Sequence, residues 1–403
     1  MNTQSPELNG RPSPAGSSTF QVMCIVGARP NFMKIAPLMR AFAASPTIEA
    51  VLVHTGQHYD RAMKAAFFDQ LAIPEPDVDL GVGSASHAVQ TAEIMLRFEP
   101  ILDERRPDAL LVVGDVNSTI ACALVAAKKG VPVVHVEAGL RSYDRAMPEE
   151  VNRVLTDQLS SLLFTTERLA QKNLELEGIE ANRIRFVGNV MIDTLLAHRA
   201  RASSARDVLR RVGIPEERIP SGKFALVTLH RPSNVDDPET LGRLVDTLAD
   251  LSVELPLVFP LHPRTRGRLE QGGLLQRAEQ VMVLLPPLDY LDMLGLMLEA
   301  RLVLTDSGGI QEETTALGVP CLTLRDNTER PITVGQGTNT VVGSDRKRIL
   351  EAARDVLQSG GKAGRIPELW DGHAAERIAA ELSNWLSASR HRQGHRTAAP
   401  THG

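Results

Sequence analysis

The chain has 403 residues and a formal net charge of −5, with 44 lysines and arginines against 49 acidic residues. This acidic balance argues against a general nucleic-acid-binding surface. Hydrophobic residues make up 43% and charged residues 23% of the chain, as in ordinary globular proteins, and the length predicts two domains. No apolar run approaches the roughly 18 residues that a membrane span needs, so we expect no membrane span and a cytoplasmic protein.

The first predicted domain covers residues 20–192. It follows a polar segment rich in Ser, Pro and Gly, residues 1–19, which predicts a disordered tail instead of a signal peptide. Strands are expected at Gln21–Val26, Glu49–Thr55, Ala109–Val113, Val131–Val136 and Ser161–Thr165, and helices from about Met33, at Ala85–Arg105, at Asn117–Lys129 and from Pro148. In the helix that Pro148 opens, the buried face is expected to consist of Val151, Leu155, Leu159 and Leu162.

The second predicted domain, residues 193–372, repeats this alternation. Its strands are expected at Phe224–Leu229, Leu257–Pro260, Val281–Leu284, Leu302–Thr305 and Val319–Leu322. Apolar strands that alternate with helices indicate parallel sheets covered on both faces. The predicted fold class is α/β, with two Rossmann-like doubly wound domains facing a central cleft, where ligands bind beyond the strand carboxyl ends. A final helix, residues 373–389, is expected to pack back on the first domain and to precede a disordered tail, residues 390–403.

A turn of small residues follows the predicted strand Leu302–Thr305 and opens a helix. Ser307, Gly308 and Gly309 let backbone N–H groups approach an anion there, and the helix amino terminus adds its positive dipole end. Glu313 lies about one to one-and-a-half turns further along, where its carboxylate can accept two ribose hydroxyls. Because the turn alone is equally well explained as a helix cap, its meaning depends on the rest of the chain.

Cationic and imidazole groups recur after predicted strands in both halves. Arg29 and Lys34 follow the first strand, His230 and His262 follow two strands of the second half, and Arg330 follows the strand after the Ser-Gly-Gly helix. Each of these side chains alone could be a solvated surface charge. Their shared position at strand carboxyl ends predicts an anion-binding rim on each sheet.

Three acids occupy the same kind of position in the first half. Asp115 follows the strand Ala109–Val113, where a helix cap is the alternative. Glu137 stands among apolar neighbours, where a charge is costly unless it is paired or functional; a buried ion pair with an arginine such as Arg141 is its alternative. Glu149 lies in the first turn of a helix, where it could simply complement the helix dipole. Together they predict acid–base chemistry beside the anion site.

Cofactor and metal motifs are absent from the sequence. No G-x-G-x-x-G fingerprint follows the first strand, which disfavours a nicotinamide cofactor, and no HExxH, CxxC or nucleophile-elbow motif is present. The cysteines Cys24, Cys122 and Cys321 are far apart in apolar segments and are expected to be buried and reduced. We therefore expect no cofactor and no metal.

Acid–base chemistry on a phosphorylated sugar fits this combination of groups. A sugar stereocentre that is not adjacent to a carbonyl is very difficult to deprotonate directly. Departure of an anomeric diphosphate makes the step feasible, because positive charge develops at C1 and acidifies the C2 proton. The cationic rim would stabilise the leaving diphosphate, and the carboxylates would stabilise the cation and move the proton.

The sequence resembles the non-hydrolysing UDP-N-acetylglucosamine 2-epimerases. The matching segments are GARPNFMKIAPL, TGQHYD, VVGDVNST, HVEAGLRS, MPEEVNRVLTD, FVGNVMIDTL, TLHRPSN, LTDSGGIQEE and RDNTERP, which occur in the family's order between about Phe20 and Gly343. The resemblance implies a fold similar to the GT-B glycosyltransferases, usually as a homodimer. It also implies anti elimination of UDP to a bound 2-acetamidoglucal and re-addition on the other face, which gives UDP-N-acetylmannosamine.

The resemblance also implies residue roles. By motif, the catalytic candidates are Asp115, Glu137, Glu149 and His230, and the UDP contacts are Arg29, Lys34, Ser307, Gly308, Glu313 and Arg330, with Gly309 in the same turn and His262 nearby. The motifs leave open which of the three acids takes the C2 proton. The family's activity supplies precursors for cell-surface polysaccharides.

Two segments depart from the pattern of many bacterial members. The histidine motif continues as Arg231-Pro232-Ser233-Asn234 where His-Arg-Arg-Glu is frequent, and Gln57-His58 is followed by Tyr59-Asp60 where a second glutamine is frequent. In the family that glutamine helps to bind a second UDP-sugar as an activator, so activation by substrate is open. A modified substrate such as a 2,3-diacetamido uronate also stays open.

Three other functions stay open on the sequence alone. A GT-B glycosyltransferase would need an acceptor groove, often marked by a basic or apolar patch, which the sequence does not show. A non-catalytic nucleotide-sugar sensor would have no use for the acids. Hydrolysis to UDP and free N-acetylmannosamine differs from epimerisation only in whether water reaches the glucal first.

Overall fold

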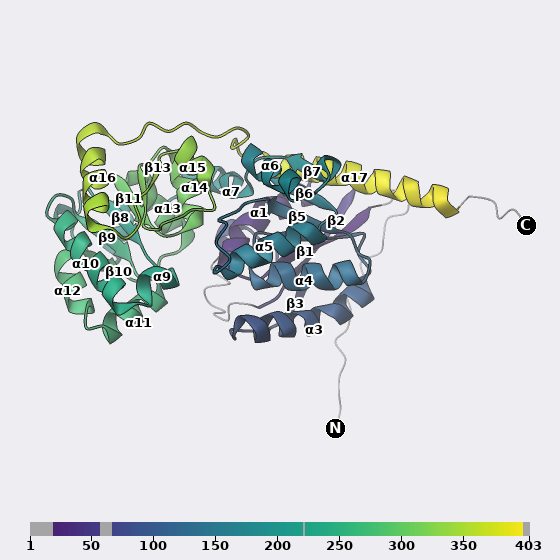
Figure 1. Ribbon diagram of the computed structural model, residues 1–403, viewed down its shortest axis with the longest axis horizontal. Helices are drawn as coiled ribbons and strands as arrows, with labels where there is room; N and C mark the ends of the chain where they lie inside the picture. Colours follow the sequence, from purple (N-terminus) through teal and green to yellow (C-terminus); the bar gives the residue numbers. More distant parts are fainter. Residues whose placement is uncertain (1–18, 57–66, 221, 398–403) are drawn as a thin grey trace, which may run out of the picture.

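Two parallel sheets organise the chain in the computed structural model, which describes residues 19–56, 67–220 and 222–397. The first sheet has the strand order β3-β2-β1-β4-β5-β6-β7 and the second β10-β9-β8-β11-β12-β13. Figure 1 shows them as the two halves of the molecule. The strands are β1 (Phe20–Val26), β2 (Ile48–His54), β3 (Val78–Asp79), β4 (Ala109–Val113), β5 (Val133–Ala138), β6 (Leu162–Thr165), β7 (Ile184–Phe186), β8 (Ala225–Thr228), β9 (Leu257–Pro260), β10 (Val283–Leu285), β11 (Leu302–Thr305), β12 (Cys321–Thr323) and β13 (Asn339–Val341).

Helices connect successive strands, as parallel pairing requires. Around the first sheet they are α1 (Arg29–Ala43), α3 (His87–Arg105), α4 (Asn117–Lys128), α5 (Pro148–Leu159), α6 (Arg168–Leu176) and α7 (Val190–His198), with 3-10 turns at Ala181–Arg183 and Arg199–Arg201. Around the second they are α8 (Ala205–Arg211), α9 (Pro232–Val235), α10 (Pro238–Ser252), α11 (Pro263–Gln271), α12 (Leu275–Val281), α13 (Tyr290–Glu299), α14 (Gly308–Leu317), α15 (Pro331–Gly335) and α16 (Arg346–Ser359), with a 3-10 turn at Glu216–Arg218. The last helix is α17 (Ala374–Thr397).

The predicted fold class is confirmed, and the predicted central strands recur within a few residues of their expected bounds. The sequence did not predict β3, β7 and β13, which are two or three residues long and lie at sheet edges. Such short segments offer too few residues for an apolar run to be recognised. The three cysteines are buried and free, as expected.

The expected buried face of α5 is wrong at Val151 and Leu155, whereas Leu159 is partly buried against the core and Leu162 is buried at the start of β6. Val151 and Leu155 are 37% and 49% exposed, whereas the residues that α5 buries are Glu150, Arg153, Thr156 and Asp157. The helix therefore turns its polar side chains toward the carboxyl edge of the first sheet, because their ionic partners lie there. The side chains of Val151 and Leu155 remain at the surface.

A shared hydrophobic core ties the two halves to the end of the chain. Phe42 of α1, Leu195 of α7 and Leu382 of α17 belong to one cluster of buried residues that also includes side chains of the second sheet. Trp370 is buried in the same cluster, and its indole Nε1 donates a hydrogen bond to the carbonyl oxygen of Thr166, 3.0 Å away. The chain thus returns to the first sheet before α17 begins, and Figure 1 shows α17 alongside it.

Helix α17 is longer than predicted. It continues to Thr397, although the sequence from residue 390 onward was expected to be disordered. Arg390 explains the first part of this extension, because its guanidinium lies 4.1 Å from the ring centre of Phe20 and bonds to Asp108 at 3.2 Å. Across the described ranges, no helix is long and apolar enough to cross a membrane.

Because Trp370 lies where the chain returns to the first sheet, the two tryptophans should contribute unequally to the free energy of unfolding. Trp370→Phe should lower the free energy of unfolding by about 2 kcal/mol, because it leaves the buried Thr166 carbonyl without its donor. Trp385→Phe is the matched control, since Trp385 is only partly buried at the edge of the core. Urea unfolding followed by circular dichroism measures both; equal midpoints for the two variants would contradict this role of Trp370.

Candidate active site

The predicted site residues flank the points where the strand order reverses, which is where doubly wound sheets bind ligands. These points lie between β1 and β4 in the first sheet and between β8 and β11 in the second. Lys34 follows β1 and Asp115 follows β4, while His230 follows β8 and Ser307 follows β11. Two ion pairs, Glu149 with Arg231 and Glu137 with Arg330, join the two halves near these points.

Glu137 is the centre of these pairs. Its Oε1 lies 2.7 Å from Lys34 Nζ and 2.8 Å from Arg330 Nη2, and all three side chains are buried. The predicted alternative partner, Arg141, pairs instead with Asp157 and Glu177. Lys34 belongs to the first half and Arg330 to the second, so this carboxylate holds the two halves together. A diphosphate bound here would share both cations with Glu137.

The backbone at Glu137 is unusual. Its φ is +71°, in the left-handed region that costs a non-glycine residue about 1–3 kcal/mol, and the pairing of β5 with β6 shifts register between Val136 and Ala138. Gly139, two residues later, also has a positive φ of +80°, and a Cβ there would lie 2.3 Å from the Ala170 carbonyl oxygen. The bulge turns the Glu137 carboxylate out of the sheet toward the cations.

Arg330 continues the chain of charges into the second half. Its Nε lies 2.9 Å from Glu312 Oε1, which also accepts a hydrogen bond from Asn189 at the start of α7. Burial favours the neutral guanidine, but Glu312, Glu137 and other acids outweigh it and hold the pKa of Arg330 well above its ordinary value. Burial raises the pKa of Glu312 to about 7 against the pull of Arg330.

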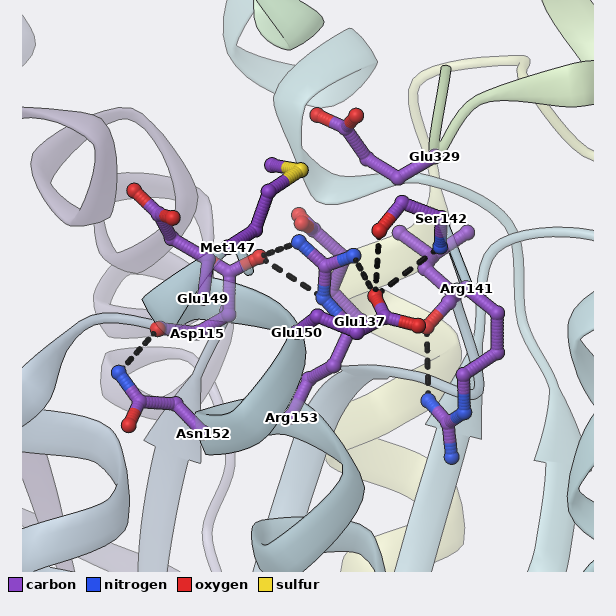
Figure 2. Close-up of polar contacts among 12 residues, drawn as sticks. Asp115, Glu137, Arg141, Ser142, Met147, Glu149, Glu150, Asn152, Arg153 and Glu329 are labelled. Carbon is purple, nitrogen blue, oxygen red and sulfur yellow. Dashed lines mark hydrogen bonds and ion pairs between the residues drawn. The ribbon is translucent and has the colours of Figure 1, made fainter. Parts of the chain in front are cut away.

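Arg153 holds Asp115 in place. Figure 2 shows its guanidinium between the carboxylates of Asp115 and Glu150, at 2.5 Å and 2.6 Å. Glu150 also accepts hydrogen bonds from the backbone of Ser142 and Tyr143. Burial alone would raise the pKa of Asp115, but Arg153 and more distant cations outweigh burial and keep this pKa below its ordinary value. Asp115 is thus an ionised carboxylate at neutral pH, and it does not cap α4.

Glu149 is more accessible and faces the second half. Its side chain is 35% exposed, and its Oε1 lies 3.6 Å from Arg231 Nη1. The same guanidinium lies 3.6 Å from Glu329, which in turn pairs with Arg325. Arg231 therefore bridges an acid of each half at the rim of the site.

The two predicted histidines lie together. His230 Nδ1 is 3.0 Å from Asp306 Oδ1, and the His230 ring centre is 5.7 Å from that of His262. Burial favours protonated Asp306, but the contact with His230 and backbone N–H donors outweigh burial and keep the pKa of Asp306 low. His262 caps α11 by accepting the N–H of Arg264. A partly exposed imidazole held by a carboxylate can act as an acid or a base.

The Ser-Gly-Gly turn forms the start of α14, as predicted. Ser307 occupies the cap position without a side-chain cap bond, and a Cβ added to Gly308 would lie 2.5 Å from Glu329 Oε1. A Cβ on Gly309 would meet Met191 of α7 at 3.0 Å. A side chain at Gly308 would therefore force the Glu329 carboxylate to shift. The carboxylate of Glu329 stands beside this helix end, where a diphosphate would also be attracted.

Glu313 is buried in α14 and is the residue after Glu312. It accepts a hydrogen bond from the Tyr290 hydroxyl at 3.1 Å. Burial raises its pKa to about 7, with Tyr290 opposing the shift and Glu312 adding to it. Ribose hydroxyls could replace or join Tyr290 as donors to this carboxylate.

Two predictions concern parts that the structure leaves undescribed. Arg29 is the first residue of α1, but its side chain lies outside the described atoms. The segment from Gln57 to Asp60 lies outside the described residues altogether. Among the residues that are described, no group of His, Cys, Asp and Glu could hold a metal ion.

Sequence reasoning missed several residues of this network. Glu167 is the second residue after the end of β6. A search for acids that follow predicted strands, which pointed to Asp115 and Glu137, would also have pointed to Glu167. Arg153 was overlooked because the apolar residues of α5 were assigned to its buried face. Glu312 could not be separated from Glu313 by sequence, because both lie in the same motif.

Two facing Rossmann-like sheets, with cations and carboxylates joined across their carboxyl edges, define a GT-B-like enzyme for a nucleotide-linked sugar. The model of the UDP-N-acetylglucosamine 2-epimerase family matches residues 40–383, and the chain belongs to this family. It is therefore an isomerase, a UDP-sugar 2-epimerase, which confirms the family and the enzyme class expected from the sequence.

Individual relatives agree on this class but differ in their sugar. The chain is 41% identical over 368 residues to the UDP-2,3-diacetamido-2,3-dideoxy-D-glucuronate 2-epimerase of Pseudomonas aeruginosa, covering 90% of this chain and 99% of the relative. It is 40% identical over 372 residues to the UDP-N-acetylglucosamine 2-epimerase of Methanocaldococcus jannaschii, again covering 90% and 99%. The crystal structure of the latter enzyme with UDP-GlcNAc and UDP superposes with a TM-score of 0.83 at 38% identity, over 90% of this chain and 99% of that one.

The buried acids predict how stability depends on pH. Burial raises the pKa of Glu167 to about 8, with Arg330 opposing the shift and Glu312 adding to it, from the usual 4.5. The folded protein therefore keeps a proton that the unfolded chain releases, so stability from this group is full below about pH 4.5 and is lost as the pH rises toward 8. Glu167→Gln should remove this loss, and its gain in stability over the wild type should rise from about 2 kcal/mol at pH 6 to about 4 kcal/mol at pH 8.

Urea unfolding at several pH values measures this difference. Glu175→Gln is the matched control, because Glu175 is exposed on the neighbouring helix α6. If the free energy of unfolding depends on pH in the same way for the wild type and Glu167→Gln, the prediction is contradicted.

Proposed function

We propose that the chain interconverts UDP-N-acetylglucosamine and UDP-N-acetylmannosamine, for the supply of cell-surface polysaccharide precursors. The observation that carries this proposal is the grouping of Asp115, Glu137 and Glu149 at one sheet edge, where Arg330 and Arg231 of the second half pair with Glu137 and Glu149. A glycosyltransferase with the same fold would have no need for three acids there. A sensor would need only the nucleotide contacts.

The proposed reaction proceeds by anti elimination and re-addition. One of the three acids takes the C2 proton while the C1–O bond to UDP breaks, which leaves a 2-acetamidoglucal with a double bond between C1 and C2. Delivery of a proton to the other face of C2, and attack of the diphosphate oxygen on C1, give the manno product. His230 is the fourth catalytic candidate, because its imidazole can carry a proton near the leaving oxygen.

The nucleotide is proposed to bind mainly to the second domain, residues 193–372. The residues proposed to contact UDP are Arg29, Lys34, His262, Ser307, Gly308, Gly309, Glu313 and Arg330. The amino terminus of α14 supports this assignment, since it offers N–H groups and a positive dipole end to the diphosphate. The acid–base residues belong to the first domain, residues 20–192, apart from His230.

A 2,3-diacetamido uronate is the second candidate substrate. The 41% identity to the Pseudomonas aeruginosa enzyme supports it, and so does Arg231. The buried Nε of Arg231 has no hydrogen-bond partner among the described residues, and the guanidinium lies between Glu149 and Glu329. A sugar carboxylate could complete the contacts of this guanidinium.

Reaction with each sugar in D₂O tests the proposal. We expect UDP-N-acetylglucosamine to give the manno product with deuterium at C2, read by NMR, and to react faster than the diacetamido uronate. Asp115→Asn should lose at least about 100-fold in kcat while UDP still binds, because a charged acid–base group is replaced by an amide.

The outcomes separate the alternatives. Absence of C2 deuterium with both sugars would reject the epimerase function, and faster turnover of the uronate would reassign the substrate. Net release of UDP and free sugar would identify hydrolysis. Unchanged turnover of Asp115→Asn would remove Asp115 from the reaction.

We further propose that the enzyme is a cytoplasmic homodimer that uses the exposed apolar side chains of α3 and α5. Val89 and Leu96 on α3, with Val151 and Leu155 on α5, are exposed, and both helices pack against α4. Leu155→Asp should therefore shift the protein from dimer to monomer in light scattering, because a charge in an apolar interface loses its hydration. Val253→Asp, at an exposed position of the second half, is the matched control. A dimeric Leu155→Asp variant would place the interface elsewhere.

A further inference from the structure

A buried histidine on β5 connects to the turn that carries Asp115. His135 is fully buried, and its Nε2 lies 2.8 Å from the carbonyl oxygen of Gly114. A carbonyl oxygen can only accept, so Nε2 carries a proton and donates it. Gly114 has a φ of +66° and immediately precedes Asp115. His135 thus fixes the peptide from which the Asp115 side chain departs.

The other side of the same imidazole connects to the turn that carries Glu137. His135 Nδ1 is 2.6 Å from Asp157 Oδ1, and Asp157 Oδ2 accepts the N–H of Gly139 at 3.1 Å. Arg141 Nη2 also pairs with Asp157 at 2.7 Å. Asp157 therefore holds the backbone two residues beyond Glu137, on the far side of the left-handed turn.

A second proton must lie between His135 Nδ1 and Asp157 Oδ1. A carboxylate oxygen and an unprotonated ring nitrogen are both acceptors, and they would repel at 2.6 Å. Since Nε2 already donates to Gly114, the pair holds two protons in all. Arg141 pairs with Glu177 as well as with Asp157, so a second carboxylate offsets its charge. Neither His135 nor Asp157 contacts the carboxylate of Asp115 or Glu137 through a hydrogen bond or ion pair among the described residues.

We propose that His135 and Asp157 are positioning residues, which set the spacing of the Asp115 and Glu137 carboxylates by tying together the two turns that carry them. This proposal rests on the 2-epimerase reaction proposed above and concerns how its acids are held. The strained backbone at Glu137 needs such support, because left-handed geometry at a glutamate persists only where its surroundings impose it. The buried polar face of α5 supplies that support from Asp157.

Three variants cut the network at different points. Asp157→Asn keeps the side-chain shape but replaces the charged acceptor. His135→Asn places an amide nitrogen near the Nδ1 position and keeps a donor for Asp157, whereas His135→Gln places one near Nε2 and keeps a donor for Gly114. Asp292→Asn is the matched control, because Asp292 is a buried carboxylate that pairs with Arg211 and Ser203 in the second half.

The expected result is a loss in turnover without a loss in binding. Asp157→Asn should reduce kcat about 100-fold, since small misplacements of reacting groups cost about that much. KM and the UDP affinity should stay within threefold of wild type. Each histidine variant should also lose kcat, because each keeps only one of the two contacts that His135 makes. The control should lower Tm without this loss of kcat.

Crystal structures of Asp157→Asn and the wild type provide a readout that does not depend on turnover. We expect the 137–139 turn to move and the separation of the Asp115 and Glu137 carboxylates to change. Unmoved carboxylates, or a kcat within threefold of wild type, would overturn the proposal. An equal loss of kcat in Asp292→Asn would also overturn it, by showing a general effect of stability. If the wild type exchanges no C2 proton, the 2-epimerase proposal fails, and the two structures alone decide the positioning role.

Discussion

The buried ionic chain from Lys34 through Glu137 and Arg330 to Glu312 is the constraint on which the molecule depends. Each of these charges would cost several kcal/mol to bury alone, and only close pairing offsets that cost. Lys34 and Glu137 belong to the first half of the chain, Arg330 and Glu312 belong to the second, and the pair between Glu137 and Arg330 joins the halves. The halves must therefore meet at their strand carboxyl ends before the charges are satisfied. This requirement places the acids of one sheet against the cations of the other.

The same requirement explains why α5 turns a polar face inward. Arg153 and Asp157 lie one turn apart and point to the edge of the first sheet, where Asp115 and His135 need partners. An apolar face at this position would leave those groups buried without partners, at about 1–3 kcal/mol for each lost contact. Val151 and Leu155 consequently lie outside, where they are available to another surface.

The alternation of apolar strands and helices was sufficient to predict the fold, because most of the central strands are continuous buried runs. Position after a strand was sufficient to predict that Asp115, Glu137 and Lys34 lie at the carboxyl edge of the first sheet. It could not show that Glu137 pairs with Lys34 and Arg330, since that choice depends on a bulge and a left-handed turn that only the folded backbone reveals. The inward face of α5 was missed for a related reason: helical periodicity identifies an apolar side, but not which side faces the sheet.

The shared cations also bear on the proposed chemistry. Lys34 and Arg330 neutralise Glu137 while no diphosphate is present, and a diphosphate that binds to them would compete for the same N–H donors. A carboxylate that loses part of its cationic partners holds a proton more strongly. UDP departing from C1 would draw these cations toward itself at the moment when the C2 proton needs an acceptor. Leaving-group stabilisation and proton transfer would then be coupled through two side chains.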